Sequence, residues 1–115
     1  MKIIVAGSRG FNDYDYLKSS LDNIIGDKFD VEIVTGMARG ADTLGIKYAN
    51  EMGHEVKEFP AQWDKYGKSA GYKRNAEMAQ YADTCVCFWD GFSKGTKHMI
   101  DLAYKYNLKV HIIKY

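Results

Sequence analysis

The chain has 115 residues, enough for one domain built around a single apolar core. Sixteen basic and fifteen acidic side chains leave a formal net charge of +1, so the composition gives no support to a surface that binds nucleic acid or another polyanion. No apolar run has the length of a signal peptide core or a membrane span. We therefore expect a cytoplasmic protein without a membrane partner.

The two cysteines, Cys85 and Cys87, lie two residues apart in an apolar run that predicts a strand, where both side chains face the same side. A disulfide between them is geometrically disfavoured, and free cysteine is among the residue types most often buried. We therefore interpret both as core residues. His54, His98 and His111 lack the spacing of metal ligands, so the sequence predicts no metal site.

Short apolar runs rich in β-branched residues alternate along the chain with longer segments of helical period. The runs predict five strands, over residues 2–6, 31–35, 55–59, 84–89 and 109–114. The segments between them predict four helices, one on Tyr14, Leu17, Leu21, Ile24 and Ile25, one on Ala41, Leu44, Tyr48, Ala49 and Met52, one over about 69–81 and one over about 94–106.

Strict alternation of strands and helices is typical of an α/β fold with a parallel sheet. Right-handed crossovers turn such a chain into a Rossmann-like, doubly wound five-stranded sheet with helices on both faces, and the simplest strand order is 3-2-1-4-5. We expect residues 1–115 to form this single domain. The switch point then lies between the first and fourth strands, and a ligand is expected beyond the carboxyl ends of the strands there.

Three glycine-rich loops, GSRGFND, TGMARGAD and DGFSKGTK, follow the first, second and fourth predicted strands. Each combines glycines with a hydroxyl and a basic residue and then opens a helix. Glycine permits close backbone approach, and a helix N-terminus attracts anions. The loops predict a phosphate site that uses Gly7, Ser8, Arg9, Gly10, Phe11, Thr35, Gly36, Arg39, Gly40, Asp42, Asp90, Gly91, Ser93, Lys94, Gly95 and Thr96. The alternative is that these glycines only end strands and start helices, with Ser93 as a helix cap.

The known nucleotide fingerprints do not fit these loops. GSRGF is not G-x-G-x-x-G, and the second strand ends in Thr35-Gly36 without the acidic residue that holds the ribose of a dinucleotide. No loop reads G-x-x-x-x-G-K-[ST], which disfavours a P-loop NTPase and its magnesium ion. The sequence therefore predicts no bound cofactor.

Residues 59–79 form a further unusual segment, in which the third strand runs into aromatic residues, two glycines and an Arg-Asn pair. Trp63, Tyr66 and Tyr72 are candidates for stacking on a base. Arg74 is a candidate for a bidentate contact to phosphate, and Asn75 for a hydrogen bond to a sugar or base edge. The alternatives are that the aromatic residues cover the core and that Arg74 is merely solvated.

The segments GSRGF, TGMARGAD, FPAQWDKYGKSAGYKRNAEMA and WDGFSKGT occur in that order over nearly the whole chain, which resembles the YspA-like branch of the SLOG superfamily. That superfamily also includes the LONELY GUY cytokinin-activating phosphoribohydrolases and DNA-processing protein A. The resemblance implies a Rossmann-like fold and a site for a nucleotide or nucleotide-derived ligand of the ADP-ribose kind. Many members of the branch are short bacterial or phage proteins, and the resemblance implies such an origin here.

The resemblance also bears on hydrolysis, because LONELY GUY enzymes carry P-G-G-x-G-T-x-x-E and R-K-x-x-M. Residues 95–96 match the Gly-Thr of the first motif, but Met99 stands where the glutamate is expected. Arg74 and Met78 match the second motif, with Asn75 in place of the lysine. The glutamate is expected to assist as the N-glycosidic bond breaks, a step that needs a titratable group, and methionine has none.

If the protein is an enzyme, we expect Arg74 to supply electrostatic stabilisation and Asp42 or Asp90 to supply acid chemistry. Asp101 lies two residues beyond Met99, and positions i and i+2 do not share a helix face. Asp42, in the first turn of a predicted helix, is equally well explained as a partner of the helix dipole. We therefore favour binding over hydrolysis.

The sequence leaves three functions open. The favoured one is a small protein that senses or sequesters a nucleotide-derived ligand through phosphate loops and aromatic stacking. The alternative is an N-glycosidase or phosphoribohydrolase acting on nucleoside monophosphates or related nucleotides. Binding of single-stranded DNA ranks third because the net charge is near zero.

A homo-oligomer is the expected assembly. The related enzymes are usually dimers or larger, and the chain has more aromatic residues than one core needs. Tyr104, Tyr106 and Tyr115, at the C-terminal end, are candidates for an interface, and the alternative is that they cover the edge of the sheet.

Overall fold

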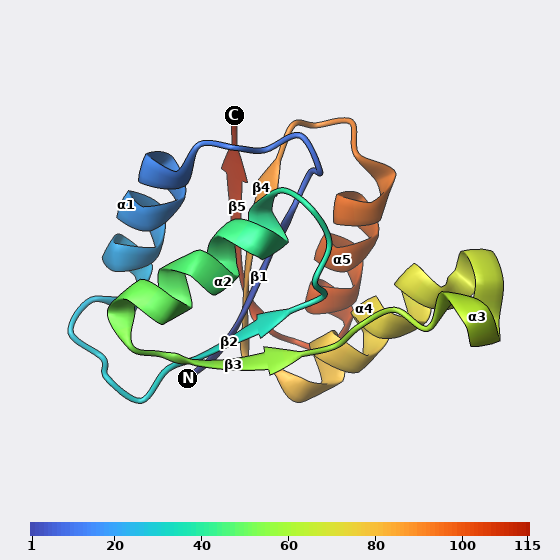
Figure 1. Ribbon diagram of the computed structural model, residues 1–115, viewed down its shortest axis with the longest axis horizontal. Helices are drawn as coiled ribbons and strands as arrows, with labels where there is room; N and C mark the ends of the chain where they lie inside the picture. Colours follow the sequence, from blue (N-terminus) through green and yellow to red (C-terminus); the bar gives the residue numbers. More distant parts are fainter.

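The computed structural model describes residues 1–115, and a parallel five-stranded sheet forms its centre (Figure 1). The strands are β1 (Lys2–Gly7), β2 (Glu32–Thr35), β3 (Glu55–Glu58), β4 (Thr84–Trp89) and β5 (Lys109–Lys114). The helices are α1 (Tyr14–Ile25), α2 (Ala41–Met52), α3 (Trp63–Tyr66), α4 (Ala70–Tyr81) and α5 (Lys94–Lys105), and a 3₁₀ turn, η1 (Gly67–Ser69), joins α3 to α4.

The strand order is β3-β2-β1-β4-β5 and every neighbouring pair is parallel, so the predicted Rossmann-like topology is confirmed. β1 is the central strand: its Ile3 lies opposite Ile33 of β2 on one side and Thr84 of β4 on the other. The switch point therefore lies between β1 and β4, and the loops that follow these strands end at the same edge of the sheet.

Alternate strand residues face two separate apolar cores, because successive side chains of a strand point to opposite faces. Ile3 packs with residues of α1 and α2, whereas its neighbour Ile4 packs with residues of α4 and α5. Cys85 and Cys87 belong to the second core and are fully buried, as predicted. Figure 1 shows the two helix pairs on opposite sides of the sheet, which confirms that helices cover both faces.

Local chemistry sets the ends of the helices. α1 begins after Asp13, whose carboxylate accepts a hydrogen bond from the backbone N–H of Tyr16 at 3.1 Å. α2 ends at Met52 and is capped by Gly53, which has a left-handed conformation with φ 74° that glycine adopts without steric cost. None of the helices is both long and apolar enough to cross a membrane.

The short helix α3 is the main element that the sequence analysis missed. It has four residues, and none of them is buried, so no apolar period marks it. The predicted third strand also ends one residue earlier than expected, at Glu58. Figure 1 shows α3 projecting from the body of the molecule beyond the end of α4.

The tyrosines near the C-terminus are exposed but also contact their own chain. The ring of Tyr115 packs edge-on against Phe11 with centroids 4.7 Å apart, and the hydroxyl of Tyr106 accepts a hydrogen bond from Gln80 at 3.2 Å. Tyr104 is the most exposed of the three. The predicted homo-oligomer stays a prediction.

Gly45 allows α2 to approach β1, and its replacement should destabilise the fold. A Cβ at this position would lie 2.9 Å from both Cβ and Cγ1 of Val5, well inside van der Waals contact. We expect Gly45→Ala to lower the free energy of unfolding by ~1–3 kcal/mol in urea titrations, because overpacking forces side chains or backbone to shift. Gly10→Ala is the control, since a Cβ there meets nothing within 4 Å. Equal stability of the two variants would contradict this close packing.

Candidate functional site

The three glycine-rich loops meet at the carboxyl edge of the sheet. The backbone N–H of Ser8 donates to the carbonyl of Phe88 at 3.1 Å, and the Ser8 hydroxyl accepts from the backbone N–H of Asp90 at 3.4 Å. Gly40, with φ 81°, brings the loop after β2 so close to the Ser8 carbonyl that a Cβ has no room. The predicted convergence of the loops after β1, β2 and β4 is therefore present in the structure.

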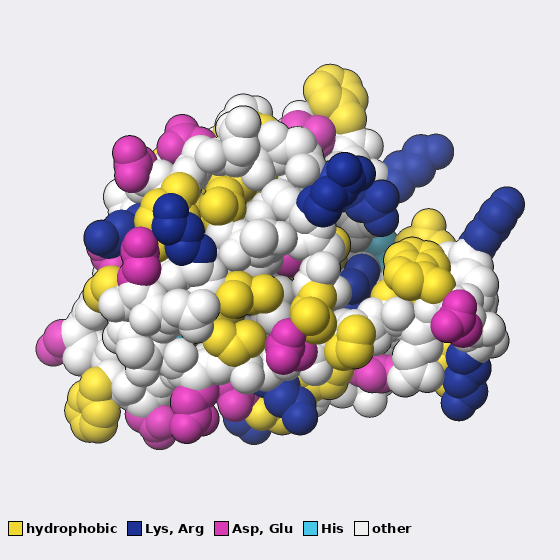
Figure 2. Space-filling view, in the orientation of Figure 1, with side chains coloured by type: hydrophobic (Ala, Val, Ile, Leu, Met, Phe, Trp, Pro, Cys, Tyr) yellow, Lys and Arg dark blue, Asp and Glu magenta, His cyan; other side chains and the backbone are white.

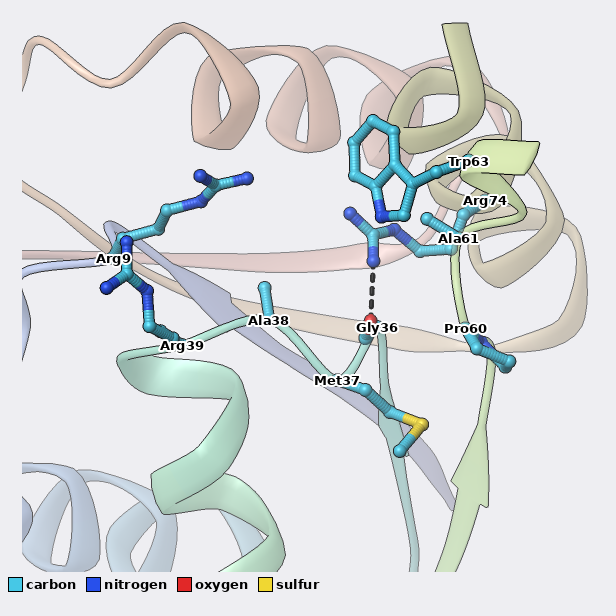
Figure 3. A pocket seen from close by; sticks show the side chains of 9 residues that line it. All are labelled: Arg9, Gly36, Met37, Ala38, Arg39, Pro60, Ala61, Trp63 and Arg74. Atoms are coloured by element: carbon cyan, nitrogen blue, oxygen red, sulfur yellow. Dashed lines mark hydrogen bonds between the residues drawn. The ribbon is translucent and has the colours of Figure 1, made fainter. Parts of the chain in front are cut away.

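An outer cavity of about 340 Å³ opens between the loop after β2 and the segment that leads into α3. The chain has only three arginines, Arg9, Arg39 and Arg74, and all of them line this cavity. Figure 3 shows Arg9 and Arg39 on one side of it and Arg74 with Trp63 on the other. Figure 2 shows Lys and Arg side chains gathered beside a hollow in the same region. The volume of the outer cavity is in the range of small-molecule binding sites.

Arg74 reaches the cavity from α4 and is held by two hydrogen bonds. Its Nη1 donates to the carbonyl of Gly36 at 2.5 Å, and its Nε donates to Oδ1 of Asn75 at 2.9 Å. A Cβ on Gly36 would lie 2.8 Å from the Cζ atom of Arg74, so a larger residue here would displace the guanidinium from its present position. Burial lowers the pKa of Arg74 and the nearby Asp42 carboxylate opposes this. Arginine nevertheless remains charged at physiological pH.

An inner cavity of about 110 Å³ adjoins the outer one, with Arg9, Ala38 and Arg74 common to both. Its opposite wall is the N-terminus of α5, where the Ser93 hydroxyl accepts from the backbone N–H of Thr96 at 3.4 Å. Ser93 is therefore a helix cap, one of the two roles that the sequence left open. The N-terminus of a helix of this length is a suitable wall for an anion, because its first N–H groups have no partner within the helix.

Asp42 faces the inner cavity from the first turn of α2 and is the only acidic residue that lines it. It is 5% exposed, and its Oδ2 accepts from the backbone N–H of Ala38 at 3.3 Å. Desolvation by burial raises the pKa of Asp42 to about 6, although the Ala38 hydrogen bond and the charge of Arg74 oppose the rise. The carboxyl group therefore titrates close to neutral pH, within reach of a ligand in the cavity.

The structure brings most of the predicted site residues to these two cavities. The residues that line one or both are Gly7, Arg9, Gly36, Arg39, Asp42, Trp63, Arg74, Asn75, Ser93, Gly95 and Thr96. Predicted residues that do not line them are Ser8, Gly10, Phe11, Thr35, Gly40, Asp90, Gly91 and Lys94. Of the three aromatic candidates for stacking, only Trp63 lines the outer cavity, whereas Tyr66 and Tyr72 lie outside it.

Two of the residues outside the cavities have clear structural roles instead. Phe11 is a core residue, 3% exposed, and its ring stacks on Phe88 with centroids 4.9 Å apart. The Asp90 carboxylate is occupied within its own loop, where Oδ1 accepts from the backbone N–H groups of Phe92 at 2.8 Å and Ser93 at 2.9 Å. These hydrogen bonds lower the pKa of Asp90, which makes it a poor general acid.

The sequence analysis did not assign several cavity residues to the site. Met37 and Ala38 lie within the second loop, and Pro60 and Ala61 follow β3. Their apolar side chains carry no chemical signal, and only the position of their loops beyond the carboxyl ends of β2 and β3 could have indicated them. Met99, which the sequence analysis singled out, lines the inner cavity and is 1% exposed.

The fold and the cleft together define a class: a Rossmann-like α/β domain with an arginine-lined cleft at the carboxyl edge of its sheet. The model of the YspA, cpYpsA-related SLOG family (YAcAr) matches residues 1–66. The chain belongs to this family, and the family indicates nucleotide-related binding or processing. The chain is also 33% identical to the Gene 61 protein of Mycobacterium phage D29, over 95% of this chain and 93% of that protein. No solved structure matches.

Replacement of the buried carboxylate of Asp42 should stabilise the protein at neutral pH. Because its pKa is higher in the folded state than the ordinary value of 3.8, folding is favoured by protonation, and stability falls as pH rises through about 6. We expect Asp42→Asn to raise the free energy of unfolding at pH 7.5 by ~1–3 kcal/mol, since two pKa units correspond to about 3 kcal/mol. The gain should disappear near pH 4, as urea titrations at both pH values would show.

Asp64→Asn is the matched control, because this carboxylate is exposed on α3. It should change the free energy of unfolding by less than ~0.5 kcal/mol at either pH. A gain for Asp42→Asn of the same size at pH 4 and pH 7.5 would show that charge burial is not its cause.

Proposed function

We propose that the protein binds a nucleotide-derived ligand that carries phosphate, of the ADP-ribose kind, in the two adjoining cavities. The observation that carries this proposal is that all three arginines of the chain, Arg9, Arg39 and Arg74, line one cavity. The thirteen lysines show no such gathering, since none lines either cavity. Arginine is the residue best suited to phosphate oxygens because its planar fork donates two parallel hydrogen bonds.

The geometry supports this ligand class in two further ways. Arg74 uses two of its five N–H donors on Gly36 and Asn75, so three remain for phosphate oxygens. Trp63 is half exposed on the wall of the outer cavity, where its indole presents a flat surface for a base. A ligand that spans both cavities thus meets arginines, an aromatic face and the N-terminus of α5.

The identity of residue 99 favours binding over turnover. Three residues of α5 line the inner cavity, Gly95, Thr96 and Met99, and none of them is acidic. Asp101 points elsewhere, since its carboxylate pairs with Lys97 at 2.6 Å on the exposed face of the helix. The cavity therefore lacks an acid at the position that serves the related hydrolases.

Hydrolysis of an N-glycosidic bond is the second candidate function, and Asp42 is the observation that favours it. Its carboxyl group lines the inner cavity, and burial raises its pKa to about 6, which suits a general acid near neutral pH. Arg74 adjoins it and would stabilise negative charge on the leaving or attacking group. Asp90, the other acid that the sequence suggested, is held in its own loop.

The binding proposal predicts that arginine side chains, and not positive charge in general, determine affinity. We expect ADP-ribose to bind the purified protein in isothermal titration calorimetry and to quench the fluorescence of Trp63. Arg39→Gln should weaken binding tenfold or more, because a charge-assisted hydrogen bond contributes ~1.5–3 kcal/mol. Lys105→Gln, at the far end of α5, removes the same charge and should leave affinity unchanged. Absence of binding by ADP-ribose, ADP and AMP would refute the proposal.

If the protein hydrolyses N-glycosidic bonds, the bound nucleotide should be converted to products and not only held in the cleft. Incubation with AMP should release free adenine, detected by chromatography, and Asp42→Asn should reduce the rate ~100-fold or more while binding persists. Asp101→Asn is the control, since this residue lies outside both cavities and should retain full activity. AMP that stays intact with the wild-type protein removes this candidate and leaves binding alone.

A further inference from the structure

A chain of side-chain hydrogen bonds connects α5 to the loop after β2 through Arg74. Nδ1 of His98, on α5, lies 3.3 Å from Nδ2 of Asn75, on α4. Oδ1 of the same Asn75 amide accepts from Nε of Arg74 at 2.9 Å, and Nη1 of Arg74 donates to the Gly36 carbonyl at 2.5 Å. Asn75 is buried, with 8% of its surface exposed, so its amide has little access to water as a substitute partner.

The direction of every hydrogen bond in this chain follows from one end. The guanidinium of Arg74 can only donate, so Asn75 must turn its oxygen toward Arg74 and its NH₂ group toward His98. Nδ1 of His98 must then accept, which requires a neutral ring with its proton on Nε2. If Nδ1 carried a proton, two donors, Nδ1–H of His98 and the NH₂ group of Asn75, would face each other. Rotation of the Asn75 amide would instead place its NH₂ group against the Nε–H donor of Arg74.

We propose that His98 is a positioning residue for the ligand cleft: as a neutral imidazole it orients Asn75, and Asn75 holds the guanidinium of Arg74 across the cavity, so that acid pH disorganises the site. The role of Arg74 in binding rests on the proposed function, whereas the coupling of His98 to Arg74 does not. His98 does not line either cavity and acts only through its neighbours.

The surroundings of His98 are consistent with a neutral ring. From α4, Tyr72 packs edge-on against it with ring centroids 4.5 Å apart, and Arg74 lies beyond the Asn75 amide. From α5 itself, Lys94, Lys97 and Asp101 border the same recess. Burial lowers the pKa of His98, and the Asp101 carboxylate opposes this. Lys97 already pairs with Asp101, which weakens the opposing effect.

The coupling can be tested without any ligand. Long-range ¹H–¹⁵N spectra of the histidine rings at pH 7.5 should show His98 as the neutral form protonated on Nε2. The Nε proton of Arg74 should exchange slowly with water. His98→Phe, which offers no acceptor to Asn75, should speed this exchange, and His98→Asn, whose Oδ1 replaces the ring acceptor, should restore it. A ring protonated on Nδ1, or equal exchange in all three proteins, would overturn the proposal.

The consequence for the cleft is tested with ADP-ribose, whose diester phosphates do not titrate between pH 5 and 8. At pH 7.5, His98→Phe should weaken binding about fivefold, the equivalent of one lost hydrogen bond, and His98→Asn should lie within about twofold of wild type. At pH 5 the wild-type protein should bind more weakly than His98→Asn, which carries no titrating ring. This comparison cancels the titration of Asp42, which both proteins share.

The possible outcomes separate the two proposals. If wild type binds more tightly than His98→Asn at pH 5, the charged ring attracts the ligand directly and the positioning role is wrong. If His98→Phe loses thermal stability but keeps wild-type affinity, the contact is only structural and the positioning role is again wrong. If ADP-ribose fails to bind wild type while the ring and exchange results hold, the proposed ligand is wrong and the coupling of His98 to Arg74 stands.

Discussion

The guanidinium group of Arg74 joins parts of the chain that are distant in sequence. It starts from α4, donates to the loop after β2 and, through Asn75, connects to α5. Removal of such a cation from water is costly unless hydrogen bonds and a counter-charge compensate. Here the compensation comes from the Gly36 carbonyl, the Asn75 amide and the Asp42 carboxylate. Gly36, in the loop after β2, has no side chain and so leaves room for the guanidinium above it.

The buried carboxylate of Asp42 lowers the stability of the folded protein at neutral pH. An acid with its pKa raised by burial destabilises the folded protein at neutral pH, and asparagine would satisfy the same Ala38 N–H without that cost. Residues that reduce stability in this way cluster at functional sites, because selection acts on function once a fold is stable enough. The position of Asp42 beside Arg74 gives the cleft both a titratable acid and a fixed cation within one small cavity.

The order of the sheet could be predicted because alternation of strands and helices leaves few topologies, and right-handed crossovers select among them. The convergence of three loops followed from that order. The helix α3 could not be predicted, since its four residues bury nothing and give no period. The roles of Asp90 and Phe11 also depend on tertiary contacts, with neighbouring N–H groups and with the Phe88 ring, that no local pattern encodes.

Net charge describes this protein poorly because the arginines and lysines are distributed differently. The formal charge of +1 suggests a surface without preference for anions, yet three arginines converge on the outer cavity, which no acidic residue lines. Asp42 is the single acid of the adjoining inner cavity. Inside a cleft with low-dielectric walls, a few fixed charges act strongly on a ligand while distant surface charges are screened by salt. Such a field attracts a small anion that enters the cleft. A long polyanion needs a continuous basic surface, which a field confined to the cleft does not provide. The same charge distribution therefore favours a nucleotide-sized ligand over single-stranded nucleic acid.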